Sequence, residues 1–121
     1  MGAMDVVESW DRSLRVGDWD AARAALADDA TYVTADPGEE GGISCADADE
    51  IVELMRSWKG KLPDVQVVEW EVMGDHVLAR LRQPAWGDDA DWYQALTVRG
   101  DRIVLLRDFP THEAALEALG S

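Results

Sequence analysis

One acidic residue stands in an unexpected place, at the end of the apolar run RIVLLRDFP, residues 102–110. The apolar residues predict a buried strand, yet the strand ends in Asp108. Either the strand has reached the surface there, or the carboxylate points into a cavity. Burial would raise the pKa of an aspartate above its reference value of about 3.9, toward the range of a general base. The structural alternative is that Asp108 caps the helix that follows or pairs with an arginine.

The turn before this strand supplies a neighbour for Asp108. Gly100-Asp101 lies between two alternating runs and is typical of a two-residue hairpin loop. Counting outward from this loop places Tyr93 opposite Asp108, where Cβ atoms lie about 5 Å apart. A phenol there could donate a hydrogen bond to the carboxylate and orient it. Three further residues would share this face and line space for a ligand: Ala95, Thr97 and Leu106.

Other reactive residue types give weaker signals. His76 follows a turn and His112 begins the last predicted helix, so both are expected to be solvated. Two scattered histidines and the single Cys45 lack the spacing of metal ligands. The sequence has no glycine-rich phosphate loop and no serine or cysteine nucleophile signature. We expect no metal and no other cofactor. Cys45 is expected to be a bystander, although a position near a helix start can lower a thiol pKa.

The bulk composition predicts one folded domain over residues 1–121. The 47% hydrophobic and 30% charged residues are typical of globular proteins. A net charge of −14 disfavours binding to nucleic acid and to anionic membranes. No apolar run approaches the roughly 20 residues of a membrane span, and the first residues lack the pattern of a signal peptide. A single cysteine favours a reducing cytoplasm, and the abundance of alanine, aspartate, valine and arginine suggests a bacterial gene.

Two helices and a strand are predicted in the first third of the chain. Apolar residues recur at helical spacing over residues 4–15, and Gly17 ends this helix. Asp18 is placed to cap a second, short helix that reaches Leu26. A short strand follows at residues 31–33, where threonine, tyrosine and valine favour extended backbone.

A third helix is predicted after a loop at residues 36–44. Asp47 and Glu50 have the spacing of a capping pair at its start. Its apolar stripe consists of Ile51, Leu54, Met55 and Trp58. The helix should end near Gly60.

From residue 64 onward the hydrophobic period changes to two, which predicts strands. Gly74-Asp75 favours a hairpin with a type II′ turn. Its register would place three apolar pairs on one face: Val72 with Val77, Trp70 with Ala79, and Val68 with Leu81. On the opposite face Glu69 would form an ion pair with Arg80.

The second hairpin, around Gly100, is apolar on both faces. Besides the face of Tyr93, its other face would pair Val98 with Ile103 and Leu96 with Leu105. A sheet at the surface has one wet face, so this one must be covered twice, by its own helices and by something else. A second copy of the chain is the simplest second cover. A short last helix is predicted after Pro110.

Taken in order, these segments resemble the nuclear transport factor 2-like superfamily, and within it the SnoaL-like branch. The resemblance is carried by VESWDRSLRVGDWDAARAALADDATYV, DEIVELMRSW and WYQALTVRGDRIVLLRDFP, and it spans nearly the whole chain. It implies an α+β fold in which a cone-shaped, bent antiparallel sheet wraps around N-terminal helices, a cystatin-like α+β roll. It also implies a pocket at one end of the cone, dimers through the outer sheet face, and a pocket-facing, proton-moving acid at Asp108.

Two activities of the superfamily fit the residues poorly. Limonene epoxide hydrolase uses an Arg-x-Asp unit on a middle strand, where this sequence has Arg80-Leu81-Arg82. Steroid isomerase chemistry needs a base after the first strand. Asp36 is the nearest candidate, but an aspartate before proline in a glycine-rich loop is typically a turn former.

The resulting hypothesis is a SnoaL-like protein that binds a small, largely apolar organic molecule in its cone pocket. Any chemistry would be cofactor-free acid/base catalysis of the isomerase, cyclase or dehydratase type, with Asp108 as acid or base and Tyr93 as its partner. Four aromatic residues could line the pocket, although core packing is their alternative role: Tyr32, Trp58, Trp70 and Trp92. The competing hypothesis is a non-catalytic ligand-binding or dimerisation module with an inert or filled pocket. A cytoplasmic homodimer is expected, with neither nucleic acid nor membrane as a partner.

Overall fold

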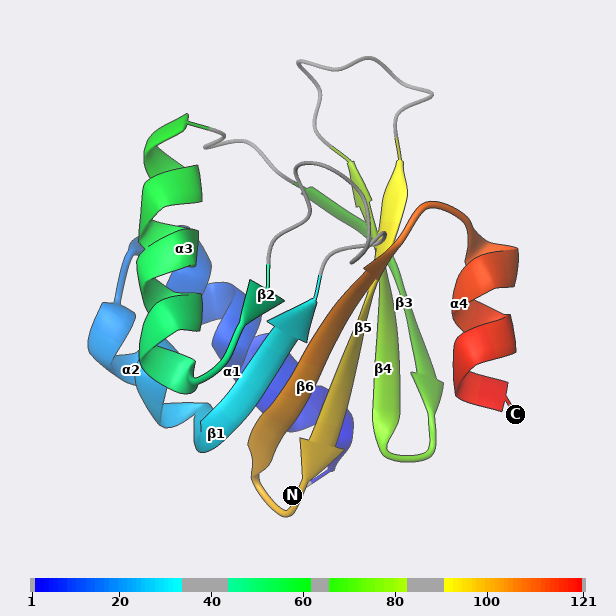
Figure 1. Ribbon diagram of the computed structural model, residues 1–121, viewed down its shortest axis with the longest axis horizontal. Helices are drawn as coiled ribbons and strands as arrows, with labels where there is room; N and C mark the ends of the chain where they lie inside the picture. The colour runs from blue at the N-terminus through cyan, green and yellow to red at the C-terminus, as the bar shows by residue number, and fades with distance from the viewer. Residues whose placement is uncertain (1, 34–43, 62–65, 83–90, 121) are drawn as a thin grey trace.

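A computed structural model describes residues 2–33, 44–61, 66–82 and 91–120 (Figure 1). The side chains of residues 58–61 and 120 lie outside this description. The helices in these ranges are α1 (Ala3–Val16), α2 (Trp19–Ala24), α3 (Ala48–Lys61) and α4 (His112–Gly120). The strands are β1 (Leu26–Val33), β2 (Ser44–Cys45), β3 (Gln66–Met73), β4 (His76–Arg82), β5 (Trp92–Arg99) and β6 (Arg102–Phe109). None of these helices has the length and apolarity needed to cross a bilayer.

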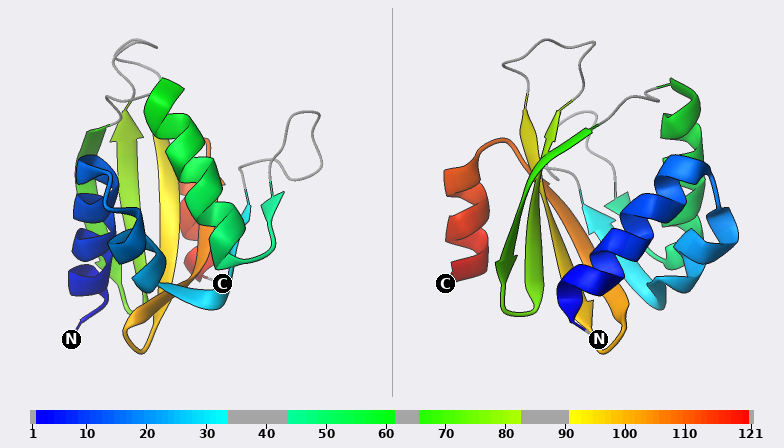
Figure 2. Two further views of the ribbon diagram at one scale, coloured as in Figure 1. Left: turned by 90° about the vertical axis from the view of Figure 1, so that its left-hand side faces the viewer. Right: turned by 180° about the vertical axis from the view of Figure 1, so that it is seen from behind.

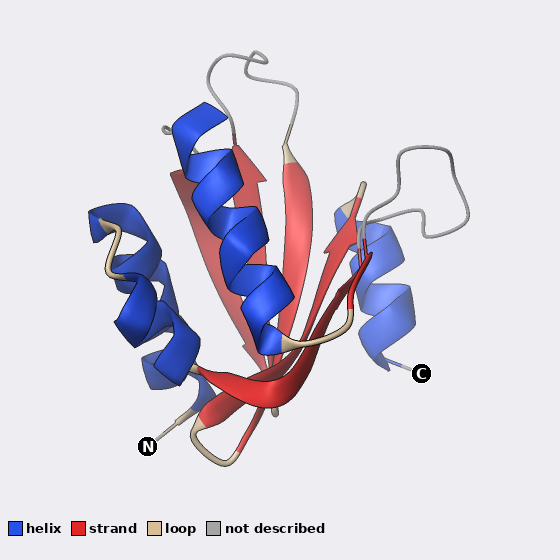
Figure 3. Cartoon of the chain, turned by 60° about the vertical axis from the view of Figure 1, so that its left-hand side comes forward, coloured by secondary structure: helices blue, strands red, loops and turns tan. Residues whose placement is uncertain are grey.

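The described strands form one curved sheet in the order β2-β1-β6-β5-β4-β3. Helices α1, α2 and α3 lie against its concave face, and α4 lies on the opposite, convex side (Figures 2 and 3). This confirms the predicted α+β fold with a bent sheet around the N-terminal helices. The sheet departs from a purely antiparallel arrangement at one place, because β1 and β6 pair in parallel.

The first two helices begin and end largely as predicted. Gly17 ends α1 in the left-handed conformation, with a φ of 74°, and the Asp18 side chain caps α2 by accepting the Ala21 N–H at 3.1 Å. The prediction for Leu26 was wrong, because this residue begins β1 instead of ending α2. Pairing with β6 sets this boundary: Ile103 donates its N–H to the carbonyl of Ala25 at 2.8 Å. Local periodicity carries no information about a partner so far along the chain.

The start of α3 has the predicted capping interaction. Asp47 Oδ1 accepts the N–H of Glu50 at 2.9 Å, and Glu50 Oε2 accepts the N–H of Ala46 at 3.1 Å. The helix ends at Lys61, next to the predicted stop. One free N–H group of the first turn, that of Glu50, and the N–H of Ala46 just before the helix are therefore satisfied by side chains that the sequence identifies.

The first hairpin follows its predicted register over most of its length. Gly74 has a φ of 64° and no other residue of this loop has a positive φ, which fits the expected type II′ turn. The pairs Val72–Val77 and Trp70–Ala79 are confirmed. Val68 does not face Leu81, because a bulge between Val67 and Glu69 places Val67 there instead.

The second hairpin has a bulge that changes which residue lies opposite Asp108. The two-residue loop at Gly100 and the pair Val98–Ile103 agree with the prediction. Val104 is then an extra residue in β6, so Thr97 faces Leu105 and every later pair moves by one.

As a consequence, Asp108 faces Gln94, and Tyr93 faces Phe109. The predicted pairing of Tyr93 with Asp108 was therefore wrong. Because side chains alternate between the faces of a strand, a shift of one residue puts the two groups on opposite faces of the sheet.

Two separate cores hold the sheet. The larger lies between its concave face and α1 to α3, and its most buried side chains include Val7, Trp10, Leu26, Ile51, Val77, Leu96, Ile103 and Leu106. The smaller lies between the convex face and α4 and consists of Leu78, Ala95 and Ala115, with Met73, Tyr93, Phe109 and Leu119 packed around them. The chain's own last helix thus supplies part of the second cover that the doubly apolar hairpin requires.

We predict that Leu106→Ala lowers the free energy of unfolding by about 2–5 kcal/mol, because Leu106 is fully buried between β1 and the helices. The matched control is Val72→Ala, where the side chain is 56% exposed and the expected change is within about 0.5 kcal/mol. Urea denaturation followed by tryptophan fluorescence measures both. Equal effects of the two substitutions would contradict the position of the core.

Candidate functional site

The convergence of β1 and β6 brings a phenol and a carboxylate together on the concave face. The parallel pairing sets Tyr32 beside Leu106, and Asp108 lies two residues further on the same face of β6. The Tyr32 hydroxyl donates a hydrogen bond of 2.5 Å to Asp108 Oδ2. This length is typical of a hydroxyl that donates to an ionised oxygen. Tyr32 is only 1% exposed and Asp108 is half-buried, so the contact is partly shielded from water.

Gln94 completes the cluster from β5, directly opposite Asp108. Its amide nitrogen donates to Asp108 Oδ1 at 3.2 Å and lies 3.4 Å from the Tyr32 hydroxyl oxygen. Each carboxylate oxygen therefore accepts a hydrogen bond from a different strand. We call Tyr32, Gln94 and Asp108 the concave-face cluster.

Burial dominates the electrostatics of the concave-face cluster. It raises the pKa of Asp108 above its usual value, although the hydrogen bonds from Tyr32 and Gln94 act in the opposite direction. Burial also raises the pKa of Tyr32, and the nearby charge of Asp108 adds to this effect. The phenol thus keeps its proton, and the carboxylate is a stronger base than an exposed aspartate.

Four of the residues predicted to form the site do lie on the concave side with Asp108. Tyr32 and Leu106 are buried in the larger core, and Trp70 and Trp92 pack against it while partly exposed. The Trp58 side chain lies outside the described residues, as does Asp36. Whether these residues bind a ligand stays a prediction.

Three predicted site residues lie on the other side of the sheet. Tyr93 and Ala95 belong to the convex-face core, and Thr97 is 2.8 Å from His76 Nδ1 on the neighbouring strand. Their predicted place beside Asp108 was wrong. The bulge at Val104 shifts the pairing of β5 with β6 by one residue, so these side chains and Asp108 point to opposite faces of the sheet. His76, expected in solvent, is half-buried in this contact.

Gln94 is the functional candidate that sequence reasoning missed. The regular register placed it opposite Arg107 on the face away from Asp108, whereas Ala95 occupies that position. No local signal marks the bulge, since Val104 is a strong strand former in an apolar run. Tyr32 was identified as a lining aromatic, but its bond to Asp108 depends on the parallel pairing of β1 with β6, which the sequence did not reveal.

The convex face carries a second polar cluster. Asp91, whose side chain is 10% exposed, binds Arg80 Nε at 2.7 Å and Arg82 Nε at 2.7 Å. Hydrogen bonds from these two arginines lower the pKa of Asp91, and the bond from Arg82 has the larger effect. Glu69 was the predicted ion-pair partner of Arg80, and the two residues do lie opposite each other in register. The guanidinium of Arg80, however, donates its hydrogen bond to Asp91. The Arg80-Leu81-Arg82 unit thus contributes no carboxylate to the concave-face cluster.

Cys45 is buried at the end of β2. Burial raises its pKa, and the charges of Glu50 and Asp47 add to the rise. The shift is opposite to the lowering that a helix start can cause, and the residue has the properties of an inert core thiol, in line with the expected bystander role.

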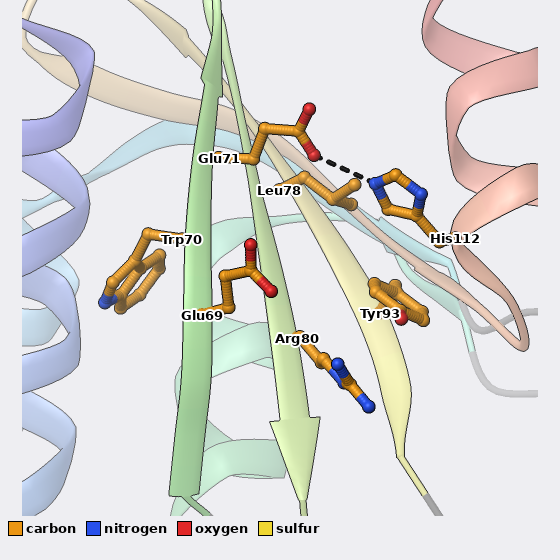
Figure 4. A pocket seen from close by; sticks show the side chains of 7 residues that line it. All are labelled: Glu69, Trp70, Glu71, Leu78, Arg80, Tyr93 and His112. Atoms are coloured by element: carbon orange, nitrogen blue, oxygen red, sulfur yellow. Dashed lines mark hydrogen bonds and ion pairs between the residues drawn. The ribbon is translucent and has the colours of Figure 1, made fainter.

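A shallow groove is also present on the convex face (Figure 4). Its volume is about 460 Å³ and it is lined by Glu69, Trp70, Glu71, Leu78, Arg80, Tyr93 and His112. His112 Nε2 lies 2.9 Å from Glu71 Oε2, which joins α4 to β3. We call this hollow the convex groove.

The curved sheet and the helices in its concavity form the nuclear transport factor 2-like fold. Residues 7–106 match the SnoaL-like domain, and the chain belongs to this family. Asp108 lies just beyond the matched segment. No curated protein matches the chain.

Solved structures share the fold. A Sinorhizobium meliloti protein with the provisional name polyketide cyclase is 22% identical, with a TM-score of 0.69 over 89% of this chain and 99% of its own. A nuclear transport factor 2-like protein of unknown function from Cytophaga hutchinsonii is 14% identical, with a TM-score of 0.69 over 100% and 96%. An LEH-like epoxide hydrolase from M. tuberculosis is 20% identical, with a TM-score of 0.63 over 98% of this chain and 96% of its own. At these identities the likeness concerns the fold alone.

We predict a pH-dependent difference in stability between the wild type and Asp108→Asn. Because folding raises the pKa of Asp108, the stability contributed by its protonated form is complete below about pH 4 and is lost as the pH rises through the folded-state pKa. The free energy of unfolding of the wild type, minus that of the variant, should therefore fall over this window. Urea denaturation at a series of pH values measures it.

Tyr32→Phe provides the companion measurement. Loss of the phenol removes a hydrogen bond that lowers the pKa of Asp108, so the fall should extend to higher pH. The substitution should also cost about 1–3 kcal/mol at neutral pH, because it leaves a shielded carboxylate oxygen without its donor. A difference between wild type and Asp108→Asn that is flat with pH would contradict the burial of this carboxylate.

Proposed function

We propose that the protein binds a small, largely apolar organic molecule on the concave side of its sheet, beside the concave-face cluster. The observation that carries this proposal is a shielded carboxylate held by a phenol at 2.5 Å and an amide at 3.2 Å. Its neighbours are mostly apolar, and two partly exposed tryptophans, Trp70 and Trp92, lie on the same side. Apolar walls with a few fixed polar groups are typical of small-molecule sites.

We further propose cofactor-free acid/base chemistry at this site. Asp108 is the group that takes up and returns a proton, because burial makes it more basic than an exposed aspartate. Tyr32 takes over the positioning role that sequence reasoning gave to Tyr93, and Gln94 fixes the second oxygen of the carboxylate. Proton transfer by a single carboxylate supports isomerisation, cyclisation or dehydration.

A second candidate function is binding without catalysis. Both oxygens of Asp108 already accept hydrogen bonds from the protein, as is usual for a structural aspartate. Tyr32, moreover, is itself part of the buried core. In this alternative the protein is a ligand carrier or dimerisation module, and the concave-face cluster holds three strands together.

Asp108→Asn separates the two functions. The substrate is sought by mass spectrometry of molecules that copurify with the protein and by screening for a ligand-induced rise in melting temperature. For an enzyme, we expect turnover to fall by about 10²–10⁴-fold while binding is kept. Glu8→Gln, at an exposed position of α1, is the control and should leave both unchanged.

A carrier would bind the ligand equally well with and without the carboxylate, and would turn it over in neither case. Turnover that is absent in the wild type, or unchanged in Asp108→Asn, would rule out the catalytic role. Failure of every ligand to raise the melting temperature would instead favour a filled pocket.

We also propose that the protein is a homodimer in a bacterial cytoplasm. One part of the convex face, on β5 and β6, has an apolar side chain that stays partly exposed: Leu105, which lies opposite Thr97. A second copy would cover this area. The single cysteine, which is buried and reduced, agrees with a cytoplasmic location.

Sedimentation equilibrium at micromolar concentration should give twice the chain mass. Leu105→Glu should shift the equilibrium toward the monomer, because it places a charge in the proposed interface. Asp101→Glu, in the exposed loop of the same hairpin, is the control. A monomeric wild type at this concentration would refute the proposal.

A further inference from the structure

The convex groove has the size and lining of a small-molecule site. Its volume of about 460 Å³ lies in the usual range for such sites. Its walls come from β3, β4, β5 and α4, four elements that the fold holds in place. Figure 4 shows the side chains of Glu69, Arg80 and Tyr93 on the groove side of the sheet, whereas the Trp70 ring points to the opposite side.

The charge within the groove is mainly negative. Glu69 and Glu71 are alternate residues of β3 and therefore lie on one face. Glu69 is exposed and makes no hydrogen bond or ion pair with any residue in the described ranges. The positive charge of Arg80 is engaged by Asp91 at 2.7 Å. A cationic group would therefore meet two carboxylates: that of Glu69, which has no polar partner among the described residues, and that of Glu71, which lies 2.9 Å from His112 Nε2.

The opposite wall is aromatic and the floor is apolar. The rings of Tyr93 and His112 are 5.4 Å apart at an angle of 51°, and Leu78 is buried beneath them. The face of a tyrosine ring attracts cations, and a leucine floor favours an apolar body. A ligand with an ammonium group and a ring would match both walls.

We propose that the convex groove binds a small organic amine, with its ammonium group at Glu69 and Glu71 and its apolar body against Tyr93 and Leu78. The overall charge of −14 raises the local concentration of cations and supports this choice. The groove shares no residue with the concave-face cluster. The proposal therefore stands or falls separately from the function proposed for Asp108.

Three probes of similar shape and different charge test the proposal: 2-phenylethylamine, 2-phenylethanol and 3-phenylpropanoate. Binding is followed by amide chemical shifts in ¹H–¹⁵N spectra of the full chain at neutral pH. We expect the amine to bind with a Kd of about 1 mM, at least about fivefold tighter than the alcohol, as is reasonable for so small a ligand. The shifts should map to β3, β5 and the start of α4, and added salt should weaken binding.

Glu69→Gln should weaken amine binding about two- to fivefold, the range expected for one partly exposed charge pair. Glu8→Gln removes the same charge from α1 and should leave the Kd unchanged. Asp108→Asn should leave it unchanged as well.

Three results would overturn the proposal: equal binding of all three probes, chemical-shift changes confined to the concave face, or no binding of the amine at about 10 mM. That concentration is about ten times the expected Kd. The last result would also be obtained if a partner copy sealed the groove, and it would count against the site in the same way.

Discussion

The structure depends on the parallel pairing of β1 with β6. This pairing joins two segments about 76 residues apart and closes the sheet around α1 and α3. It buries Leu26 and Leu106 in the larger core and sets the phenol of Tyr32 beside the strand that carries Asp108. Without it, the phenol and the carboxylate would share neither a face nor a shielded environment, and the pKa of Asp108 would have no reason to rise.

Much of the local structure could be predicted because its causes are local. Gly17 ends α1, Asp18 caps α2, and Gly74 and Gly100 make two-residue loops, each for a reason that residue type alone supplies. Register beyond those loops is different. Val104 is a strand-forming residue within an apolar run, so nothing in the local sequence shows that β6 contains one more residue than a regular ladder needs.

That single residue decided which part of the candidate site was predicted correctly. The acid was identified because a carboxylate after apolar residues is unusual wherever it lies, and the structure does place Asp108 in a half-buried position. The prediction of its partner depended on counting residue pairs along the hairpin. A register error of one residue therefore named Tyr93 in place of Gln94. The contribution of Tyr32 comes from a strand whose long-range pairing leaves no pattern in the local sequence.

The two faces of the sheet carry opposite chemical characters. The concave side surrounds one carboxylate with apolar side chains and weakly polar donors, whereas the convex side carries most of the charged residues of β3 and β4. Alternation along each strand makes this division possible within a few residues, since neighbours such as Arg80 and Leu81 face different surroundings. The fold thus keeps strongly charged groups away from Asp108 without adding any further element.

The extra residue at Val104 also divides the last hairpin into two parts, a tip around Gly100 and a far part that contains Asp108. Different contacts hold the two parts in place. The tip is fixed by its two-residue loop, and the far part is fixed by β1 on one side and β5 on the other. Removing the extra residue would leave the far pairs, Gln94 with Asp108 among them, in the same alignment. A change in length that is confined to the tip can therefore leave the orientation of Asp108 unchanged, because β1 and β5 hold the far part of β6.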